Sequence, residues 1–124
     1  MRRYRFSDLQ DAGAGRHFLH GLLSGARLYR GGLSFHPPGR VTHDEERPHV
    51  ERDEEAFCLL QGRGWIEING VREPVCGGDI LVIEPGEDHH LLSSEDDPLI
   101  NLWLHADAHG HPDRFPDSQQ KESP

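Results

Sequence analysis

The sequence predicts an all-β sandwich or barrel built as a single domain. Three observations support this prediction. The chain has 124 residues, a length that suits one hydrophobic core. Apolar runs of about five residues recur at spacings of roughly 8–12 residues, as in sandwiches and barrels. Fourteen glycines and nine prolines fall between these runs, where they favour turns.

Seven strands are predicted between residues 28 and 105. In order they are residues 28–35, 56–60, 65–68, 71–75, 79–83, 89–93 and 99–105. Asn69-Gly70 lies between the third and fourth strands and favours a type I′ hairpin turn, because both residues tolerate positive φ. Pro74 indicates an edge strand or a strand end, since proline donates no hydrogen bond to a ladder.

The two ends of the chain differ from this strand-rich part in composition. Residues 1–26 are predicted to form a short N-terminal extension, within which the glycine-rich residues 8–25 are compatible with a short helix. The barrel domain is placed at residues 27–105. Residues 106–124 are polar and contain prolines, which is typical of a flexible tail.

Composition argues against several classes of function. Twenty-two acidic residues against thirteen basic ones give a net charge of −9, which disfavours nucleic-acid and anionic-membrane partners. No run approaches 18 apolar residues and no apolar stretch follows the N-terminal arginines, so neither a transmembrane helix nor a secretory signal is expected. Cys58 and Cys76 lie in apolar runs and predict buried, reduced thiols in a cytoplasmic protein.

Potential metal ligands are concentrated in two segments. Residues 44–55 hold seven acidic residues and two arginines. If the end of this segment is extended, alternate side chains share one face: His49, Glu51, Asp53 and Glu55, then Phe57 and Leu59. Far along the chain, His89 follows the turn Pro85-Gly86. Two histidines and a carboxylate on facing strands suit Fe(II), and they also accept Mn, Ni or Zn.

The spacing of these residues resembles that of the cupin superfamily. Glu55 is followed after six residues by Gly62, and Gly78 precedes Pro85-Gly86 and His89 at the spacing of the second cupin motif. The resemblance covers roughly residues 33–105 and implies a double-stranded β-helix, or jelly-roll barrel, around a metal ion. Four features depart from the usual pattern. Nine residues rather than five separate Gly39 from His49, and Glu51 stands for histidine, Glu84 for proline and Ser93 for asparagine.

The resemblance implies a divalent metal ion held by His49, Glu55 and His89, with Fe(II) the first candidate. This ligand spacing is similar to that of cupins of the 3-hydroxyanthranilate dioxygenase type, which also lack the middle histidine. Glu51 is a fourth ligand, a general base or a solvated charge at the rim. His43 and His90 are alternative ligands, although His90 is expected to face away from His89.

The walls of a substrate pocket are predicted by strand periodicity. Asn101, Trp103 and His105 share one face of the last strand, and ordinary core packing is the alternative for Trp103. Three further residues complete the predicted pocket: Tyr29, Phe35 and Phe57.

The function predicted from the resemblance is that of a metal-dependent oxidoreductase, similar to a dioxygenase, acting on a small organic molecule. Two alternatives remain open. One is a non-oxidative isomerase or lyase acting on a sugar or an organic acid, and the other is a binding or sensing module without catalysis. A homodimer is also expected, because exposed apolar edge strands are commonly covered by pairing.

Overall fold

The structure is a computed structural model that describes residues 1–9, 22–24, 27–40 and 51–107. Eight strands and one short 3-10 helix are found in these residues: β1 (Arg2–Arg5), η1 (Phe6–Asp8), β2 (Arg27–His36), β3 (Glu54–Gln61), β4 (Arg63–Ile68), β5 (Val71–Cys76), β6 (Asp79–Ile83), β7 (His89–Ser93) and β8 (Leu99–Asp107). None of the seven predicted strands is missing. Within the same residues, no helix has the length and apolar character needed to span a membrane.

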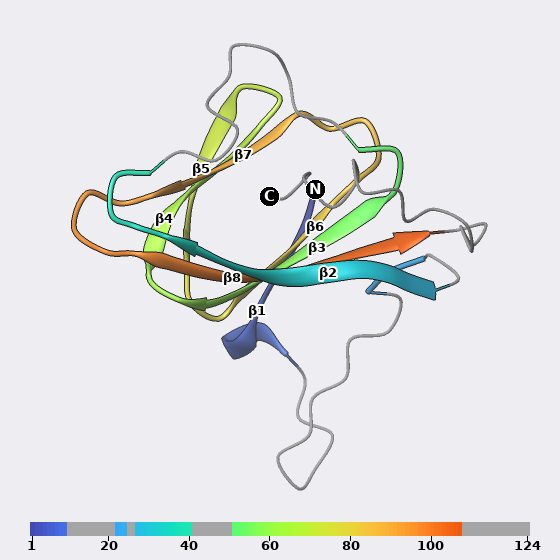
Figure 1. Cartoon of the computed structure of the whole chain (residues 1–124), viewed down its shortest axis with the longest axis horizontal. Helices are drawn as coiled ribbons and strands as arrows, with labels where there is room; N and C mark the ends of the chain where they lie inside the picture. Colours follow the sequence, from blue (N-terminus) through green and yellow to red (C-terminus); the bar gives the residue numbers. More distant parts are fainter. Residues whose placement is uncertain (10–21, 25–26, 41–50, 108–124) are drawn as a thin grey trace, which may run out of the picture.

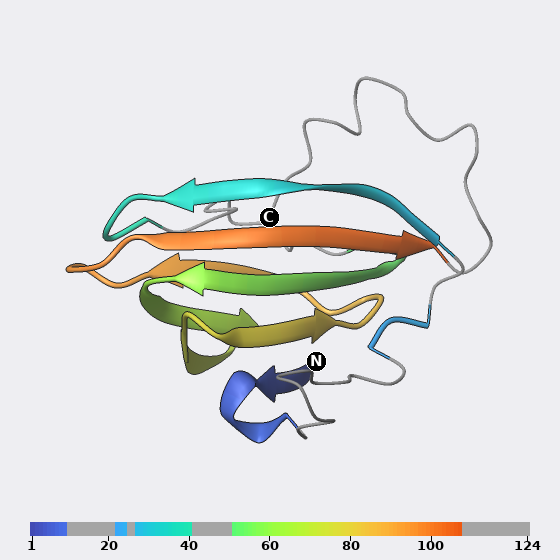
Figure 2. The same ribbon diagram turned by 90° about the horizontal axis from the view of Figure 1, so that it is seen from below.

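The strands form two antiparallel sheets that face each other across the interior of a barrel (Figure 1). The larger sheet has the strand order β1-β6-β3-β8-β2, and the smaller has the order β5-β4-β7. Figure 2 shows β2, β8 and β3 side by side, with β1 at the opposite side of the molecule. This arrangement confirms the predicted all-β jelly-roll architecture.

The N-terminal strand β1 is the element that the sequence does not predict. Its residues pair with β6, with Arg2 opposite Val82 and Arg5 opposite Asp79. The strand is polar and lies at the edge of the sheet, so it lacks the alternation of apolar and polar residues that marks a half-buried strand. The predicted tail begins too early, because Ala106 and Asp107 are the last residues of β8 and pair with β2. The rest of the tail, residues 108–124, and residues 10–21 and 25 of the possible helix fall outside the described residues.

Side chains from both sheets fill the barrel. The larger sheet contributes Phe57, Leu59, Leu81, Ile83, Leu99 and Trp103, and the smaller contributes Ile66, Val75 and Leu91. Phe57 and Leu59 are almost completely buried, as the alternation along β3 predicts. The core therefore occupies the barrel next to Glu55, the acidic residue of β3 that faces the interior.

The hairpin and edge-strand predictions are confirmed. Asn69 and Gly70 have φ values of 49° and 83°, which are those of a type I′ turn between β4 and β5. Pro74 lies in β5, an edge strand of the smaller sheet. The prediction of a buried Cys76 is wrong, because its side chain alternates with that of the buried Val75 and is exposed.

The outer face of the larger sheet carries exposed apolar side chains. Leu33, Phe35 and Leu60 are 52%, 67% and 55% exposed. Phe35 pairs with Ile100 in the β2–β8 register, whereas its neighbour Ser34 pairs with the interior residue Asn101. The prediction of Phe35 as a pocket residue is therefore corrected: strand alternation turns it outward. The homodimer stays a prediction. This outer face offers exposed apolar side chains against which a second copy of the chain can pack.

Gly62 has a backbone conformation and an environment that exclude a side chain. Its φ is +99°, and a Cβ atom added there would lie 1.6 Å from the carbonyl oxygen of Pro98. We expect Gly62→Ala to lower the free energy of unfolding by about 3 kcal/mol or more, because backbone must move. Urea unfolding of the purified variant measures this loss.

Gly70→Ala is the matched control for this substitution. Gly70 also has positive φ, +83°, but a Cβ atom added there would have no neighbour within 4 Å. We expect a loss of only about 1–2 kcal/mol, the cost of a left-handed conformation for a residue with a side chain. Equal losses in the two variants would contradict the steric explanation.

Candidate metal centre

The centre of the candidate site is the carboxylate of Glu55, which faces the barrel interior at the start of β3. Its side chain is 1% exposed. Its Oε1 lies 3.1 Å from Nε2 of His89, and its Oε2 lies 3.1 Å from Nε2 of His105. Both imidazoles are also almost completely buried. One carboxylate thus contacts two histidines in a region closed to solvent.

Strand register brings these three side chains together. Glu55 of β3 is paired directly with His105 of β8, so both side chains lie on the interior face of the larger sheet. His89 begins β7 in the smaller sheet, across the barrel from them. The cluster therefore joins the two sheets at one end of the barrel.

The two imidazoles contact different oxygens of the Glu55 carboxylate. Neither carboxylate oxygen of Glu55 meets the angular requirements of a hydrogen bond within the described residues. Nδ1 of His89 lies 3.1 Å from the carbonyl oxygen of Glu87. With a metal ion bound, a proton on Nδ1 donated there would leave the lone pair of Nε2 for the ion, which is the arrangement that fixes a histidine for metal binding.

Glu51 reaches the same place from the segment that precedes β3. One ligand atom from each of Glu51, Glu55 and His105 lies within 4.8 Å of the others. The carbonyl oxygen of Glu51 accepts a hydrogen bond of 2.9 Å from the backbone N–H of Gly86. This bond ties the Glu51 segment to the turn that precedes His89.

Burial and the two imidazoles act in opposite directions on the ionisation of Glu55. Burial raises the pKa of this carboxyl group, but the contacts with His105 and His89 outweigh it and lower the pKa from 4.5 to about 2. Burial lowers the pKa of His89, but Glu55 and, to a smaller extent, Glu51 raise it above 6.5. The metal-free cluster is therefore held together as an imidazolium–carboxylate pair.

These pKa shifts predict how the stability of the metal-free protein depends on pH. The lowered pKa of Glu55 adds up to roughly 3 kcal/mol to the free energy of unfolding above pH 4.5. This stability is lost as the pH falls toward 2. The raised pKa of His89 adds stability that is fully present below pH 6.5, the ordinary pKa of histidine. This stability is lost as the pH rises through the higher pKa of His89 in the folded protein. We expect the highest stability between about pH 4.5 and 6.5.

Urea unfolding of the metal-free protein, from about pH 3 to pH 9, tests this dependence. The Glu55→Gln variant is the control, and its stability should vary less at both ends of the range because the ion pair is gone. Stability that rises continuously from acid to alkaline pH would contradict the assignment.

The donor set fits a divalent metal ion. Glu51, Glu55 and His105 offer ligand atoms within 4.8 Å of one another, and His89 lies 3.1 Å from Glu55. This mixture of imidazoles and carboxylates is suited to Fe(II), Mn, Ni or Zn. The buried Glu55 carboxylate, which makes no hydrogen bond of good geometry within the described residues, is the observation that supports this fit. Calcium is less well matched, because it prefers oxygen ligands alone.

The structure brings together some of the predicted ligands and leaves others outside its described part. Glu51, Glu55 and His89 lie at the cluster. His49 and the alternative ligand His43 fall in residues 41–50, outside the described residues. His90 points away, and its Nε2 lies 2.9 Å from Oδ1 of Asp88.

His105 is the donor that sequence reasoning places differently. The sequence predicts a pocket wall residue, whereas the structure puts its Nε2 against Glu55. The predicted face of Asn101, Trp103 and His105 does point inward, as their burial shows. The spacing of a single motif carries no sign that β8 lies beside β3, so only the strand pairing reveals the contact.

The remaining predicted pocket residues surround the cluster. The Phe57 ring lies 5.8 Å from that of His89, edge to face, and the Tyr29 ring lies 6.1 Å from that of His105. The hydroxyl of Tyr29 donates a 2.6 Å hydrogen bond to Asp53. Trp103 packs edge to face against His105, with the guanidinium of Arg30 5.5 Å from its centroid.

The fold and the cluster define a class of protein: a small two-sheet β-barrel with an internal site of histidines and carboxylates. The chain belongs to the cupin family, because the family model described as "Cupin domain" matches residues 35–105, more than half of the sequence. No functionally curated protein matches the sequence.

Solved structures with similar folds include other cupins. A cupin protein from Bacteroides fragilis has 23% identity and a TM-score of 0.57, over 68% of this chain and 70% of that chain. A cupin 2 conserved barrel domain protein from Salinispora arenicola has 23% identity and a TM-score of 0.56, over 64% and 63%. A predicted oxalate decarboxylase from Thermotoga maritima has 24% identity and a TM-score of 0.56, over 64% and 66%. At these identities, the likeness establishes the fold alone.

Proposed function

We propose that this protein binds one divalent metal ion and uses it as an enzyme on a small organic molecule, by dioxygenase chemistry with Fe(II). The observation that carries the proposal is the buried Glu55 carboxylate, with an imidazole nitrogen 3.1 Å from each of its oxygens. Burying ionisable groups is costly unless they are paired or coordinate a metal, and a bound ion would meet this requirement for all three groups together.

Each residue of the cluster has a role in the proposal. Glu55, His89 and His105 would hold the ion, with His49 as the further ligand expected from the cupin motif. A bound ferrous ion would supply the redox chemistry that activates O₂. Glu51 lies beside the donors without being fully buried, so it is the residue we assign to proton transfer with the substrate.

Two buried polar side chains on the interior face of β8 favour a small organic molecule as the substrate. The amide of Asn101 and the indole N–H of Trp103 are buried and have no hydrogen-bond partner within the described residues. Buried polar groups left in this state cost about 1–3 kcal/mol each. A substrate with hydrogen-bonding groups and an apolar body would satisfy them while contacting Phe57.

A second candidate is non-oxidative metal-dependent chemistry, such as decarboxylation or isomerisation. The carboxylate of Glu55 among the donors is compatible with hard ions such as Mn(II), which act as Lewis acids. The structural similarity to the predicted oxalate decarboxylase from Thermotoga maritima points in the same direction. Glu51 would again move the proton.

Metal analysis followed by turnover assays tests the proposal. Protein purified without a histidine tag is expected to bind one ion per chain after anaerobic loading with Fe(II). O₂ consumption with catechols, thiols or keto acids would support dioxygenase chemistry. Turnover of an organic acid by the Mn(II) form without O₂ would support the second candidate. Binding of less than one ion per chain by Fe(II), Mn(II), Ni(II) and Zn(II) alike would refute both, and tight ligand binding without turnover would favour a binding module.

A further inference from the structure

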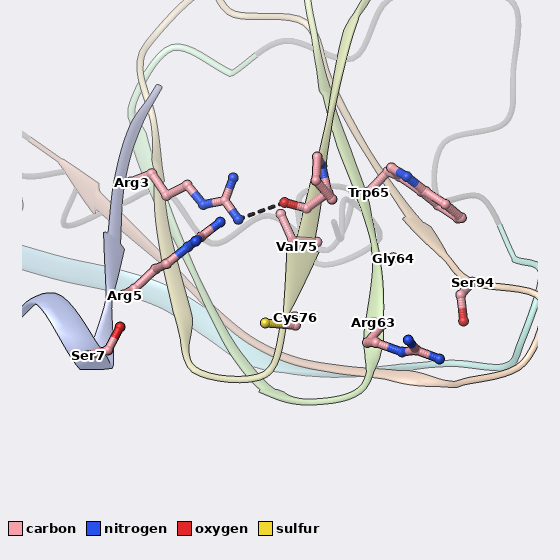
Figure 3. A pocket seen from close by; sticks show the side chains of 10 residues that line it. Arg3, Arg5, Ser7, Arg63, Gly64, Trp65, Val75, Cys76 and Ser94 are labelled. Atoms are coloured by element: carbon pink, nitrogen blue, oxygen red, sulfur yellow. Dashed lines mark hydrogen bonds between the residues drawn. The ribbon is translucent and has the colours of Figure 1, made fainter.

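A groove of about 610 Å³ lies at the end of the barrel opposite the Glu55 cluster. Arg3 and Arg5 of β1 reach toward β5 on one side of it, and Arg63 and Trp65 of β4 lie on the other (Figure 3). Glu55 is at the start of β3, whereas Arg63 follows the end of β3. The groove is therefore separate from the candidate metal centre.

The groove gathers three arginines in a strongly acidic chain. The carboxylate of Asp79, which is 2% exposed, accepts a 2.8 Å hydrogen bond from the guanidinium of Arg3. Its other oxygen lies 3.4 Å from Nε of Arg5. Asp97 pairs with Arg63 at 2.7 Å. Asp96 also acts electrostatically on Arg63. Three carboxylates therefore accompany the three guanidinium groups, so the groove is close to neutral, whereas the chain as a whole has a net charge of −9.

Guanidinium donors remain accessible to a ligand. The side chains of Arg5 and Arg63 are 51% and 69% exposed. Each guanidinium has five N–H donors, and the bond from Arg63 to Asp97 uses only two of its nitrogens, Nε and one terminal amine. An anion can therefore bind without breaking the existing ion pairs.

The rest of the lining is suited to a flat apolar group. Pro74 and Val75 of β5 line the groove between the two groups of arginines, and Trp65 lies on the Arg63 side (Figure 3). Arg63 and Trp65 are two residues apart on β4, so their side chains leave the same face of the strand about 7 Å apart. An aromatic ring against Trp65 would place an anionic substituent within reach of Arg63.

We propose that this groove is a second ligand site, which binds a small aromatic anion. The phosphate or carboxylate group of the ligand pairs with Arg63, its ring packs against Trp65, and Arg3 and Arg5 add positive potential from the opposite side. The volume of the groove lies within the range of small-molecule sites.

Isothermal titration of the purified full chain with 1-naphthyl phosphate tests the proposal. We expect one site per chain, with inorganic phosphate and 1-naphthol each binding at least about ten-fold more weakly, because each lacks half of the interaction. Arg63→Gln and Trp65→Leu should also weaken binding by about ten-fold or more. Arg72→Gln is the matched control, since Arg72 is a half-exposed strand arginine paired with Glu67 outside the groove lining, and it should leave binding unchanged.

Two further measurements locate the bound probe. Glu55→Gln should retain full affinity for 1-naphthyl phosphate, and the probe should slow alkylation of the exposed Cys76, which lines the groove. Loss of binding in Glu55→Gln would place the probe in the barrel and overturn the proposal. Equal weakening by Arg63→Gln and Arg72→Gln would indicate non-specific attraction, and an absence of binding by the wild-type chain would also overturn it.

Discussion

Replacing Glu55 with glutamine is expected to lower the affinity for a divalent metal ion by more than about 100-fold. Changes to groups that only support metal ligands already cost about 10–100-fold, and Glu55 is the carboxylate at the centre of the cluster. Glutamine keeps the size of the side chain but removes its negative charge, so the loss is electrostatic rather than steric. Metal content after loading and dialysis, together with competition against a chromophoric chelator, measures the change.

Glu54→Gln is the matched control, because the preceding residue is also a buried glutamate but faces out of the barrel. Glu54 accepts hydrogen bonds from Arg2, at 2.9 Å, and from the backbone N–H and hydroxyl of Ser24, at 2.6 and 2.9 Å. We expect it to lose about 2 kcal/mol of stability while keeping its metal affinity. If Glu55→Gln binds metal as well as Glu54→Gln does, the candidate centre is wrong.

The contrast between these neighbours illustrates what the sequence can predict. Strand periodicity places Glu55, Phe57 and Leu59 on one face, and the structure confirms that all three are buried in the interior. The same periodicity separates His89 from His90. These are local properties of extended backbone, so a sequence is sufficient to predict them.

Other features depend on contacts between distant parts of the chain. β1 is a strand because β6 offers it an unpaired edge, and nothing in the composition of Arg2–Arg5 reveals that neighbour. Phe35 belongs to an apolar strand, but which of its faces is interior depends on the register with β8. Strand alternation predicts Glu51 on an extended strand with Glu55, whereas β3 begins only at Glu54 and Glu51 reaches the cluster from the preceding segment.

His105 depends both on local strand periodicity and on a contact with a distant strand, and replacing it tests its role in metal binding. The sequence predicts its inward orientation but not its neighbour, whereas the β3–β8 register places its Nε2 3.1 Å from Glu55. If His105 is a ligand, His105→Gln should reduce metal affinity by about 100-fold or more, as should His89→Gln. Glutamine retains a polar side chain of similar length, so the buried carboxylate keeps a polar neighbour and we expect the fold to be preserved.

His90→Gln provides the control, since His90 is a partly buried histidine of β7 that contacts Asp88 on the other side of the strand. Its metal affinity should equal that of the wild-type chain. The informative comparison is between His105→Gln and His89→Gln under identical loading. A loss of metal in His89→Gln alone would mean that the ligands are those implied by the cupin motif spacing and that His105 only orients Glu55. Equal losses in both would make the last strand of the barrel part of the metal centre, which is what the direct pairing of Glu55 with His105 leads us to expect.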